Sequence, residues 1–195
     1  MNHFNNKPLA EIKPEDILDL VNAKTVEDEE LDFKHIPWPD DENGRFELLH
    51  DITALGNQRG GYLLIGISHL KDAAGRDFAS GFVSVRTAAK EAQRIRDLCF
   101  QYVDPRIQGL EVEPMIVSNE QGQVGVVAIR VPPSSSRPHG FEWREATIFV
   151  QRHGAHVLRM TISELSNLFS VRSFSATETN RRLIELRAYT KIRFC

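Results

Sequence analysis

An acidic run followed by a short alternating segment is the part of this sequence best suited to chemistry. Glu27-Asp28-Glu29-Glu30 leads directly into Leu31-Asp32-Phe33-Lys34. Apolar and polar residues alternate over 30–36, which predicts a strand with Asp32 and Lys34 on one face. Grouped carboxylates can bind a divalent cation, and a lysine beside them can neutralise them or contact a phosphate. An acidic run is also typical of a solvated charged surface, which is the slightly favoured interpretation of 27–30.

A glycine pair connects a predicted helix to a predicted buried strand. Residues 42–57 carry apolar side chains at helical spacing, and Gly60-Gly61 precedes the apolar segment Tyr62-Leu63-Leu64-Ile65. Glycine favours the left-handed backbone that ends many helices. Backbone amides at such a turn could also hold a phosphate, but this order is the reverse of a P-loop, and the chain contains no Gly-x-x-x-x-Gly-Lys-Ser/Thr. We therefore expect a helix end here and no ATP binding.

Cationic side chains occur at several places where they could contact phosphates. Arg152 stands at the end of a strand predicted at 146–152, and other arginines lie before and after it. The candidates for nucleic-acid contact are Lys34, Arg59, Arg137, His139, Arg144, Arg152 and Arg159. His153 and His156 lack a third ligand at a known spacing, so we expect them to be surface residues and not metal ligands.

Composition is that of an ordinary soluble globular protein: the 195 residues are 41% hydrophobic and 26% charged. Two cysteines give no disulfide framework, and neither a leader sequence nor an apolar run long enough to span a membrane is visible. We therefore expect a cytoplasmic protein. The net charge of −3 hides an asymmetry, because residues 1–50 hold 5 Lys/Arg against 13 Asp/Glu, whereas 130–195 hold 11 against 5. The basic half could face phosphates or simply be a solvated surface.

The order of the predicted elements indicates an α+β fold. Further helices are expected from Pro14, at 86–102 and from Thr161, and strands at 107–117 and 123–131 should pair as a hairpin. Two segments, 71–81 and 132–140, are rich in turn-forming residues and are expected to be loops. The predicted units are a helical lead (1–24), a main domain (25–169) and a basic C-terminal helical extension (170–195).

Three blocks of the sequence resemble the Schlafen AlbA-like domain over about residues 25–169. They are the acidic lead into Asp32-Phe33-Lys34, the block from Asp51 through Gly66, and Pro138-His139 with the later segments 149–152 and 162–165. The second block is the most specific. The resemblance implies a mixed sheet flanked by helices, binding of RNA or DNA, and a homodimer that encloses the nucleic acid between two lobes.

Some Schlafen proteins are metal-dependent endoribonucleases with three acidic residues, and the resemblance places two of these at Glu27 and Asp32, with Lys34 beside the scissile phosphate. Such a site would take Mg²⁺ or Mn²⁺. The third acid should follow Gly66-Ile67, where this chain has Ser68-His69. The substitution removes a carboxylate, although His69 could ligate a softer metal and Asp72 could approach from the following loop.

Three functions therefore stay open. The first is nucleic-acid binding through a basic surface, and the second is metal-dependent cleavage of RNA. The third is a regulatory module that binds a protein partner through residues 180–193, which place apolar side chains at helical spacing in a basic stretch.

Overall fold

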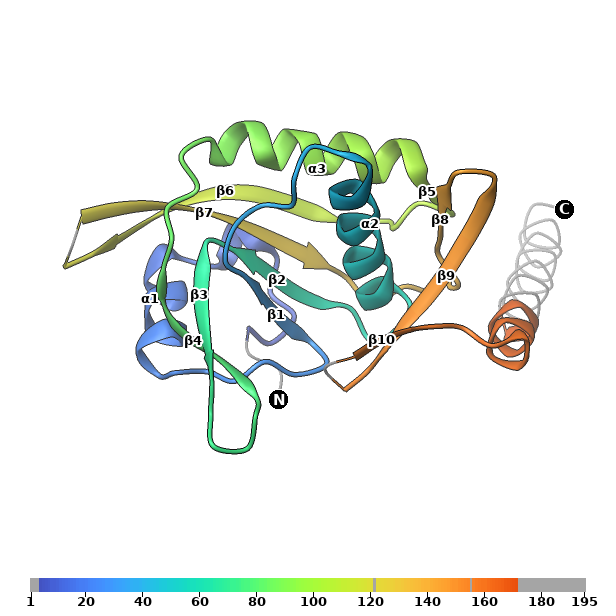
Figure 1. Cartoon of the computed structure of the whole chain (residues 1–195), viewed down its shortest axis with the longest axis horizontal. Coiled ribbons are helices and arrows are strands. Elements are labelled where there is room, and N and C mark those ends of the chain that lie inside the picture. Colours follow the sequence, from blue (N-terminus) through green and yellow to red (C-terminus); the bar gives the residue numbers. More distant parts are fainter. Residues whose placement is uncertain (1–3, 121, 155, 172–195) are drawn as a thin grey trace, which may run out of the picture.

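A four-stranded mixed sheet forms the centre of the computed structural model, which describes residues 4–120, 122–154 and 156–171 (Figure 1). Its strand order is β1 (Leu31–Lys34), β2 (Gly61–Ile65), β7 (Gly122–Val131) and β6 (Glu111–Asn119). β1 pairs with β2 in parallel, and the other two pairs are antiparallel. The fold is α+β, as the sequence predicts.

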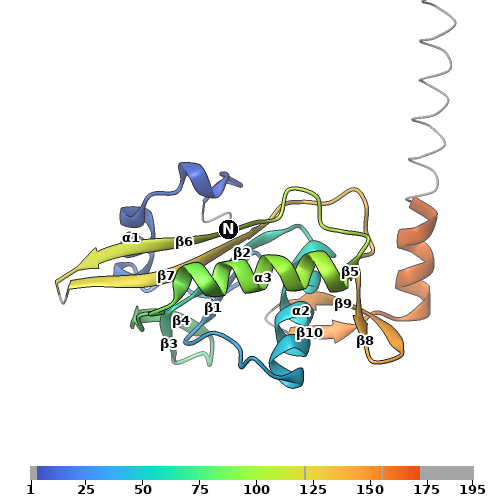
Figure 2. The same cartoon turned by 90° about the horizontal axis from the view of Figure 1, so that it is seen from above.

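Strand periodicity divides the core between the two faces of this sheet. In β2, Leu63 and Ile65 face one cluster of buried side chains, whereas Tyr62 and Leu64 face the other. The first cluster includes α2 (Glu42–Gly56) and α3 (Ala88–Tyr102), and the second includes α1 (Pro14–Asn22) and the short 3-10 helix η1 (Leu9–Glu11). Figure 2 shows α1 on one side of the sheet and α2 and α3 on the other. β2 is therefore buried on both faces, which explains why it has no polar face.

A second sheet lies beside α2. Its order is β10 (His156–Arg159), β9 (Ala146–His153), β8 (Gly140–Trp143) and β5 (Val103–Asp104), all antiparallel. The expected strand at 146–152 is confirmed as β9. The expected loop at 132–140 ends in β8, and neither β8 nor β10 was predicted, because each is a four-residue strand with little periodicity of its own.

The prediction of a loop over 71–81 is wrong. β3 (Ile67–Lys71) and β4 (Asp77–Phe82) form an antiparallel hairpin, and only the residues between them make the turn. The backbone around Val26 pairs with the outer side of β4 through a bridge to Phe78. The strand is thus held by pairing with β3 and by one bridge from a distant segment, which local composition does not reveal.

Capping residues set the helix ends. Pro14 begins α1, and the side chain of Asp41 accepts a hydrogen bond from Gly44 N at 2.7 Å at the start of α2. A further helix covers 162–171, and the expected capping box is present: Thr161 N donates to Glu164 Oε2 at 2.7 Å, and Glu164 N donates to Thr161 Oγ1 at 3.3 Å. The extension expected at 170–195 lies almost wholly outside the described residues.

The glycine pair after α2 both ends the helical segment and admits a close strand contact. Gly60 has φ +79° and donates its N–H to Leu55 O at 3.0 Å. A Cβ at Gly61, where φ is +144°, would lie 2.4 Å from Glu30 O. The next amide, Tyr62 N, donates to the same carbonyl at 2.7 Å, so Gly61 allows β1 and β2 to begin their pairing.

Candidate functional site

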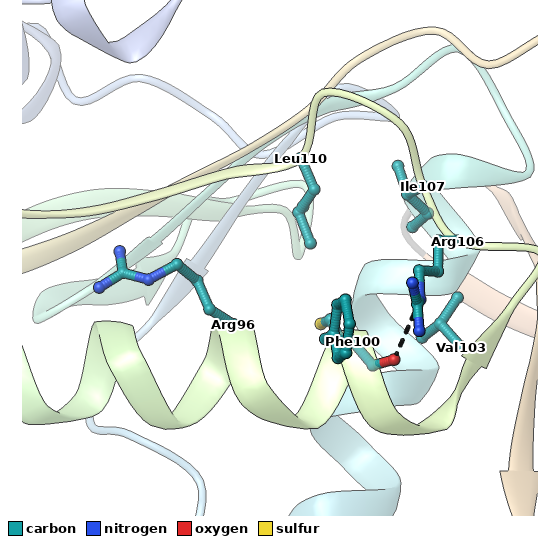
Figure 3. Close-up of a pocket in the computed structure, with 7 residues that line it drawn as sticks. Arg96, Phe100, Val103, Arg106, Ile107 and Leu110 are labelled. Atoms are coloured by element: carbon teal, nitrogen blue, oxygen red, sulfur yellow. Dashed lines mark hydrogen bonds between the residues drawn. The ribbon is translucent and has the colours of Figure 1, made fainter.

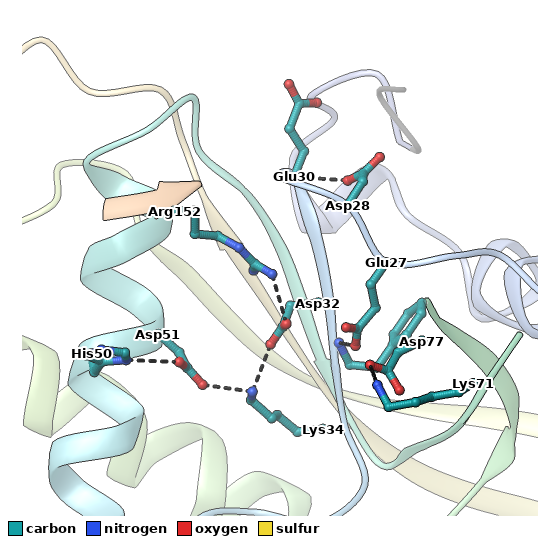
Figure 4. A network of polar contacts seen from close by, with 11 residues as sticks. Glu27, Asp28, Glu30, Asp32, Lys34, His50, Asp51, Lys71, Asp77 and Arg152 are labelled. Carbon is teal, nitrogen blue, oxygen red and sulfur yellow. Dashed lines mark hydrogen bonds and ion pairs between the residues drawn. The ribbon is translucent and has the colours of Figure 1, made fainter. Parts of the chain in front are cut away.

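The alternation of β1 aims its two charged side chains at α2. Leu31 and Phe33 are buried in the cluster on the α1 side of the sheet, so Asp32 and Lys34 point to the opposite face. Figure 4 shows both side chains in the space between β1 and α2. The predicted strand therefore does present Asp32 and Lys34 together.

Five side chains from three elements form a continuous polar chain, which we call the Lys34 network: Arg152, Asp32, Lys34, Asp51 and His50. Lys34 Nζ lies 3.1 Å from Asp32 Oδ2 and 2.8 Å from Asp51 Oδ2. Arg152 Nη2 donates to Asp32 Oδ1 at 3.1 Å, and His50 Nδ1 is 3.3 Å from Asp51 Oδ1 (Figure 4). The network joins β1, α2 and β9 through side chains alone.

Burial makes these charges depend on one another. Asp32 is 7% exposed and Arg152 is 3% exposed. Burial acts to lower the pKa of Lys34, but the carboxylates of Asp32 and Asp51 outweigh it and hold that pKa above its ordinary value. Burial likewise acts to raise the pKa of Asp51, and the hydrogen bond from His50 and the charge of Lys34 hold it below its ordinary value. Lys34 therefore stays charged, as the built-in cation between two carboxylates.

Glu27 lies outside this network but is coupled to it electrostatically. Its Oε1 accepts a hydrogen bond from Phe33 N at 2.8 Å, which directs the carboxylate to the backbone of β1. Burial, followed by the charge of Asp32, raises the pKa of Glu27 from 4.5 to about 7. The surrounding acids 28–30 are half-buried, so this run is not the fully solvated surface that the sequence slightly favoured.

The raised pKa of Glu27 predicts a pH-dependent cost to stability. The unfolded state releases this proton near pH 4.5, whereas the folded state holds it to about pH 7, so stability falls as pH rises through that window. Glu27→Gln cannot ionise and keeps the acceptor for Phe33 N. Because water reaches part of the carboxylate, we expect the variant to gain about 1–2 kcal/mol at pH 8 and almost nothing at pH 4.5.

Urea unfolding at pH 4.5 and pH 8 measures this difference. Glu29→Gln, in the same acidic run, is the matched control and should change little at either pH. Equal gains for Glu27→Gln at the two pH values would show that Glu27 titrates normally in the folded protein.

The residues expected to complete a metal set with Glu27 and Asp32 do not join them. His69 lies in β3 opposite Ala79 of β4, and its buried Nδ1 has no hydrogen-bond partner among the described residues. Asp72 is occupied in the turn, where it accepts from Arg76 N at 2.9 Å and pairs with the Arg76 guanidinium at 2.7 Å. Among the described residues, there is one compact group of three side chains that could bind a metal ion, and it lies on α2.

Two residues that were predicted to lie on a cationic surface, Arg152 and His139, are buried, so the prediction that they are exposed is wrong. Arg152 faces Asp32 under α2. His139 is 0% exposed, with Nδ1 2.7 Å from Pro105 O and Nε2 2.8 Å from Ser134 Oγ. Both side chains therefore connect segments that are distant in sequence: Arg152 binds Asp32, and His139 binds Pro105.

Three other predicted cations lie in segments that meet at the buried side chain of Asn57, just after the end of α2. Asn57 Nδ2 donates to His139 O at 2.7 Å and to Val150 O at 2.8 Å, and Asn57 Oδ1 accepts from His139 N at 2.6 Å. Arg137 Nη1 donates to Gln58 O at 2.7 Å, and the exposed Arg159 stands opposite Val150 in the β9–β10 register. With the exposed Arg59, they form what we call the Asn57 surface: Arg59, Arg137 and Arg159.

Arg144 lies apart from the Asn57 surface. It is in the turn between β8 and β9 and pairs with Glu42, the first residue of α2, at 3.1 Å. The 15-residue helix separates it from Arg59, which follows the helix end. Arg144 and the Asn57 surface therefore lie at opposite ends of α2.

A separate pocket of about 200 Å³ lies between α3 and the segment that follows it. Its wall includes Arg96, Phe100, Val103, Arg106, Ile107 and Leu110 (Figure 3). The Arg106 guanidinium lies 3.6 Å from the centre of the Phe100 ring, and Arg106 Nε donates to Phe100 O at 3.3 Å. The pocket lining has no carboxylate and no member of the Lys34 network, so it is not the predicted site.

Sequence reasoning missed Asp51 and Asn57 as the residues that organise the site. Asp51 comes three residues after Leu48 and four before Leu55, and both leucines are fully buried. A carboxylate on that face of a helix requires a buried partner, which was the available signal. Asn57 stands between a helix and a glycine pair and looked like an ordinary turn residue.

Residues 27–161 match the family model described as Schlafen, AlbA_2. The chain belongs to the Schlafen AlbA_2 family. The match runs from Glu27 to Thr161 and therefore contains the whole Lys34 network and the Asn57 surface. It confirms the resemblance drawn from the sequence. No curated protein matches the Schlafen AlbA_2 chain.

Two solved structures are similar to this Schlafen AlbA_2 chain. One is the N-terminal domain of a RecG-related protein from Nitrosomonas europaea, at 17% identity, with 77% of this chain and 95% of that one covered and a TM-score of 0.45. The other is the DIP2311 protein from Corynebacterium diphtheriae, at 20% identity, with 72% of this chain and 23% of that one covered and a TM-score of 0.43. In the part of the Schlafen AlbA_2 chain that the structure describes, no helix is long and apolar enough to cross a membrane.

Proposed function

We propose that this Schlafen AlbA_2 protein binds RNA or DNA through phosphate contacts made by the Asn57 surface. The observation that supports this most directly is that the three segments carrying Arg59, Arg137 and Arg159 meet at the buried amide of Asn57. Arginine presents a planar donor group that suits phosphate oxygens, and such contacts supply affinity without reading sequence. The surface lies beside the end of α2, and the buried Arg152 is two residues along β9 from Val150, whose carbonyl accepts from Asn57.

The test is the salt dependence of binding by the double variant Arg59→Ala/Arg159→Ala. Both side chains are exposed, so their removal should leave the fold intact. For duplex DNA we expect the magnitude of the negative slope of log K against log salt to decrease by about 2, because each lost phosphate contact removes about 0.9 from it. Fluorescence anisotropy with duplex DNA, single-stranded RNA and tRNA, each over a series of salt concentrations, gives the slopes.

An exposed arginine on another part of the molecule provides the control. Arg86 precedes α3 and is exposed, so Arg86→Ala should keep the wild-type slope. An unchanged slope in the double variant would remove the Asn57 surface from the binding site. Arg144→Ala tells whether the bound strand also reaches the other end of α2.

Metal-dependent cleavage of RNA is the second candidate, and the closeness of Glu27 to Asp32 favours it. The charge of Asp32 contributes to the raised pKa of Glu27, so a divalent cation bound between them would relieve repulsion. Carboxylate oxygens suit Mg²⁺ or Mn²⁺, and a bound ion would supply Lewis-acid stabilisation of a phosphate. Against it, Asp32 is already neutralised by Lys34 and Arg152, which leaves the cation only Glu27 as a free anionic ligand of this pair.

Incubation of labelled tRNA, single-stranded RNA and duplex DNA with Mn²⁺, Mg²⁺ or EDTA separates the two candidates. Retardation of the nucleic acid without cleavage supports binding alone. Metal-dependent cleavage that Glu27→Gln abolishes would make the nuclease the function. Glu27→Gln is preferred to a change at Asp32, because loss of Asp32 leaves Arg152 buried without its partner.

We also propose a cytoplasmic homodimer that encloses nucleic acid between two copies, which rests on the family resemblance. Light scattering coupled to size-exclusion chromatography, with and without tRNA, measures the assembly. The protein-partner hypothesis falls on residues 180–193, which lie outside the described residues.

A further inference from the structure

Three side chains on successive turns of α2 form a compact set of metal ligands that the proposed function does not use. Glu47, His50 and Asp51 occupy positions i, i+3 and i+4, so they share one face of the helix. Their ligand atoms all lie within 4.8 Å of one another. Glu47 is exposed, whereas His50 and Asp51 are half-buried, so the set opens to solvent on one side.

The spacing of these atoms is close to that around a single bound ion. His50 Nδ1 and Asp51 Oδ1 are 3.3 Å apart. Two ligands that are each about 2.1 Å from a tetrahedral Zn²⁺ lie about 3.4 Å from one another. His50 and Asp51 therefore already stand at ligand separation, with the ion replacing the proton of their hydrogen bond, and the ligand atom of Glu47 lies within 4.8 Å of both.

Neighbouring residues hold the two inner ligands in this position. Lys34 Nζ binds Asp51 Oδ2 at 2.8 Å, which leaves Oδ1 turned to His50. The His50 ring stacks on Phe46, with centroids 5.5 Å apart and an interplanar angle of 28°. Contacts of this kind around ligating side chains orient them and commonly affect metal affinity by 10–100-fold.

The chemistry of the set selects the class of ion. One imidazole nitrogen with two carboxylates suits Zn²⁺ or another first-row divalent ion better than Mg²⁺, which prefers oxygen ligands alone. Lys34 offsets the negative charge of Asp51, whereas the negative charge of Glu47 remains to attract the ion.

We propose that Glu47, His50 and Asp51 bind one divalent transition-metal ion, with Zn²⁺ as the preferred ion and water in the remaining positions. This site is distinct from the Glu27–Asp32 pair, and it does not depend on nucleic-acid binding. Because Asp51 belongs to both the metal set and the Lys34 network, the ion would stabilise the junction of α2 with β1.

Cobalt titration of the untagged full chain, without nucleic acid, tests the proposal. Bound Co²⁺ absorbs visible light through its d–d transitions, and competition with Zn²⁺ gives the zinc affinity. We expect Glu47→Gln and His50→Ala each to weaken the affinity for both ions by roughly tenfold or more, since first ligands matter at least as much as their supporting residues. His153→Ala is the matched control, because His153 is exposed and also lies near a carboxylate, 3.7 Å from Glu164 Oε1.

Thermal unfolding with and without Zn²⁺ provides a second readout. Zinc should raise the Tm of the wild type and of His153→Ala, and should raise the Tm of Glu47→Gln much less. Glu47 is exposed and Gln is nearly isosteric with it, so Glu47→Gln should fold normally even if His50→Ala does not. Unchanged cobalt affinity in Glu47→Gln and His50→Ala, or an absence of cobalt binding in the wild type, would overturn the proposal and leave the nucleic-acid proposal untouched.

Discussion

Replacing Arg152 with alanine should lower the free energy of unfolding by about 3–5 kcal/mol. Arg152 is 3% exposed, and its guanidinium supplies one of the two cations that neutralise Asp32. Without it, the Asp32 carboxylate stays buried with only Lys34, which Asp51 also requires. Urea denaturation followed by circular dichroism at pH 7 measures the change.

Two further variants separate lost charge pairing from lost packing. Arg159→Ala removes an exposed arginine from the same face of the β9–β10 pair and should cost within about 0.5 kcal/mol. Arg152→Met with Asp32→Leu removes both charges together, and we expect it to be more stable than Arg152→Ala, because no buried charge then lacks a partner. If Arg152→Ala costs no more than Arg159→Ala, the buried pair does not hold β9 to β1.

The sequence could predict the fold where periodicity and burial coincide. β2 has five buried residues in succession and α2 keeps a helical apolar spacing, and both were predicted within a few residues. The alternation of 30–36 also placed Asp32 and Lys34 on one face. β4 was missed because its sequence, with Ser80-Gly81 inside the strand, resembles a loop, although the strand pairs along its length with β3 and bridges to Val26 through Phe78.

Only the part of the site that lies on β1 could be predicted from the sequence. The sequence identifies Asp32 and Lys34 on β1, but their partners Asp51 and Arg152 come from α2 and β9, at separations that no local pattern encodes. Arg152 stands at the end of the predicted strand 146–152, and nothing in the neighbouring sequence shows that it is buried. For the same reason His139, in a proline- and serine-rich segment, was expected at the surface and is buried.

Replacing Asn57 with alanine should be nearly as damaging as the loss of Arg152. The side chain satisfies two buried carbonyls and one buried amide, from His139 and Val150, and a single alanine leaves all three without that partner. Since each buried polar group left unpaired costs about 1–3 kcal/mol, we expect a loss of about 3 kcal/mol or more. Thermal and urea unfolding of the purified variant provide the measurement.

Asn57→Asp makes the prediction sharper because it preserves the shape of the side chain. An aspartate still accepts from His139 N, but it sets a second carboxylate oxygen against the carbonyls of His139 and Val150. At pH 7 it should therefore be no milder than Asn57→Ala, and a stability close to that of the wild type would contradict the assigned hydrogen bonds. Because these bonds hold the segments that carry Arg59, Arg137 and Arg159, the same variants, assayed below their unfolding temperature, should also bind nucleic acid with a reduced salt slope if the Asn57 surface is the binding site.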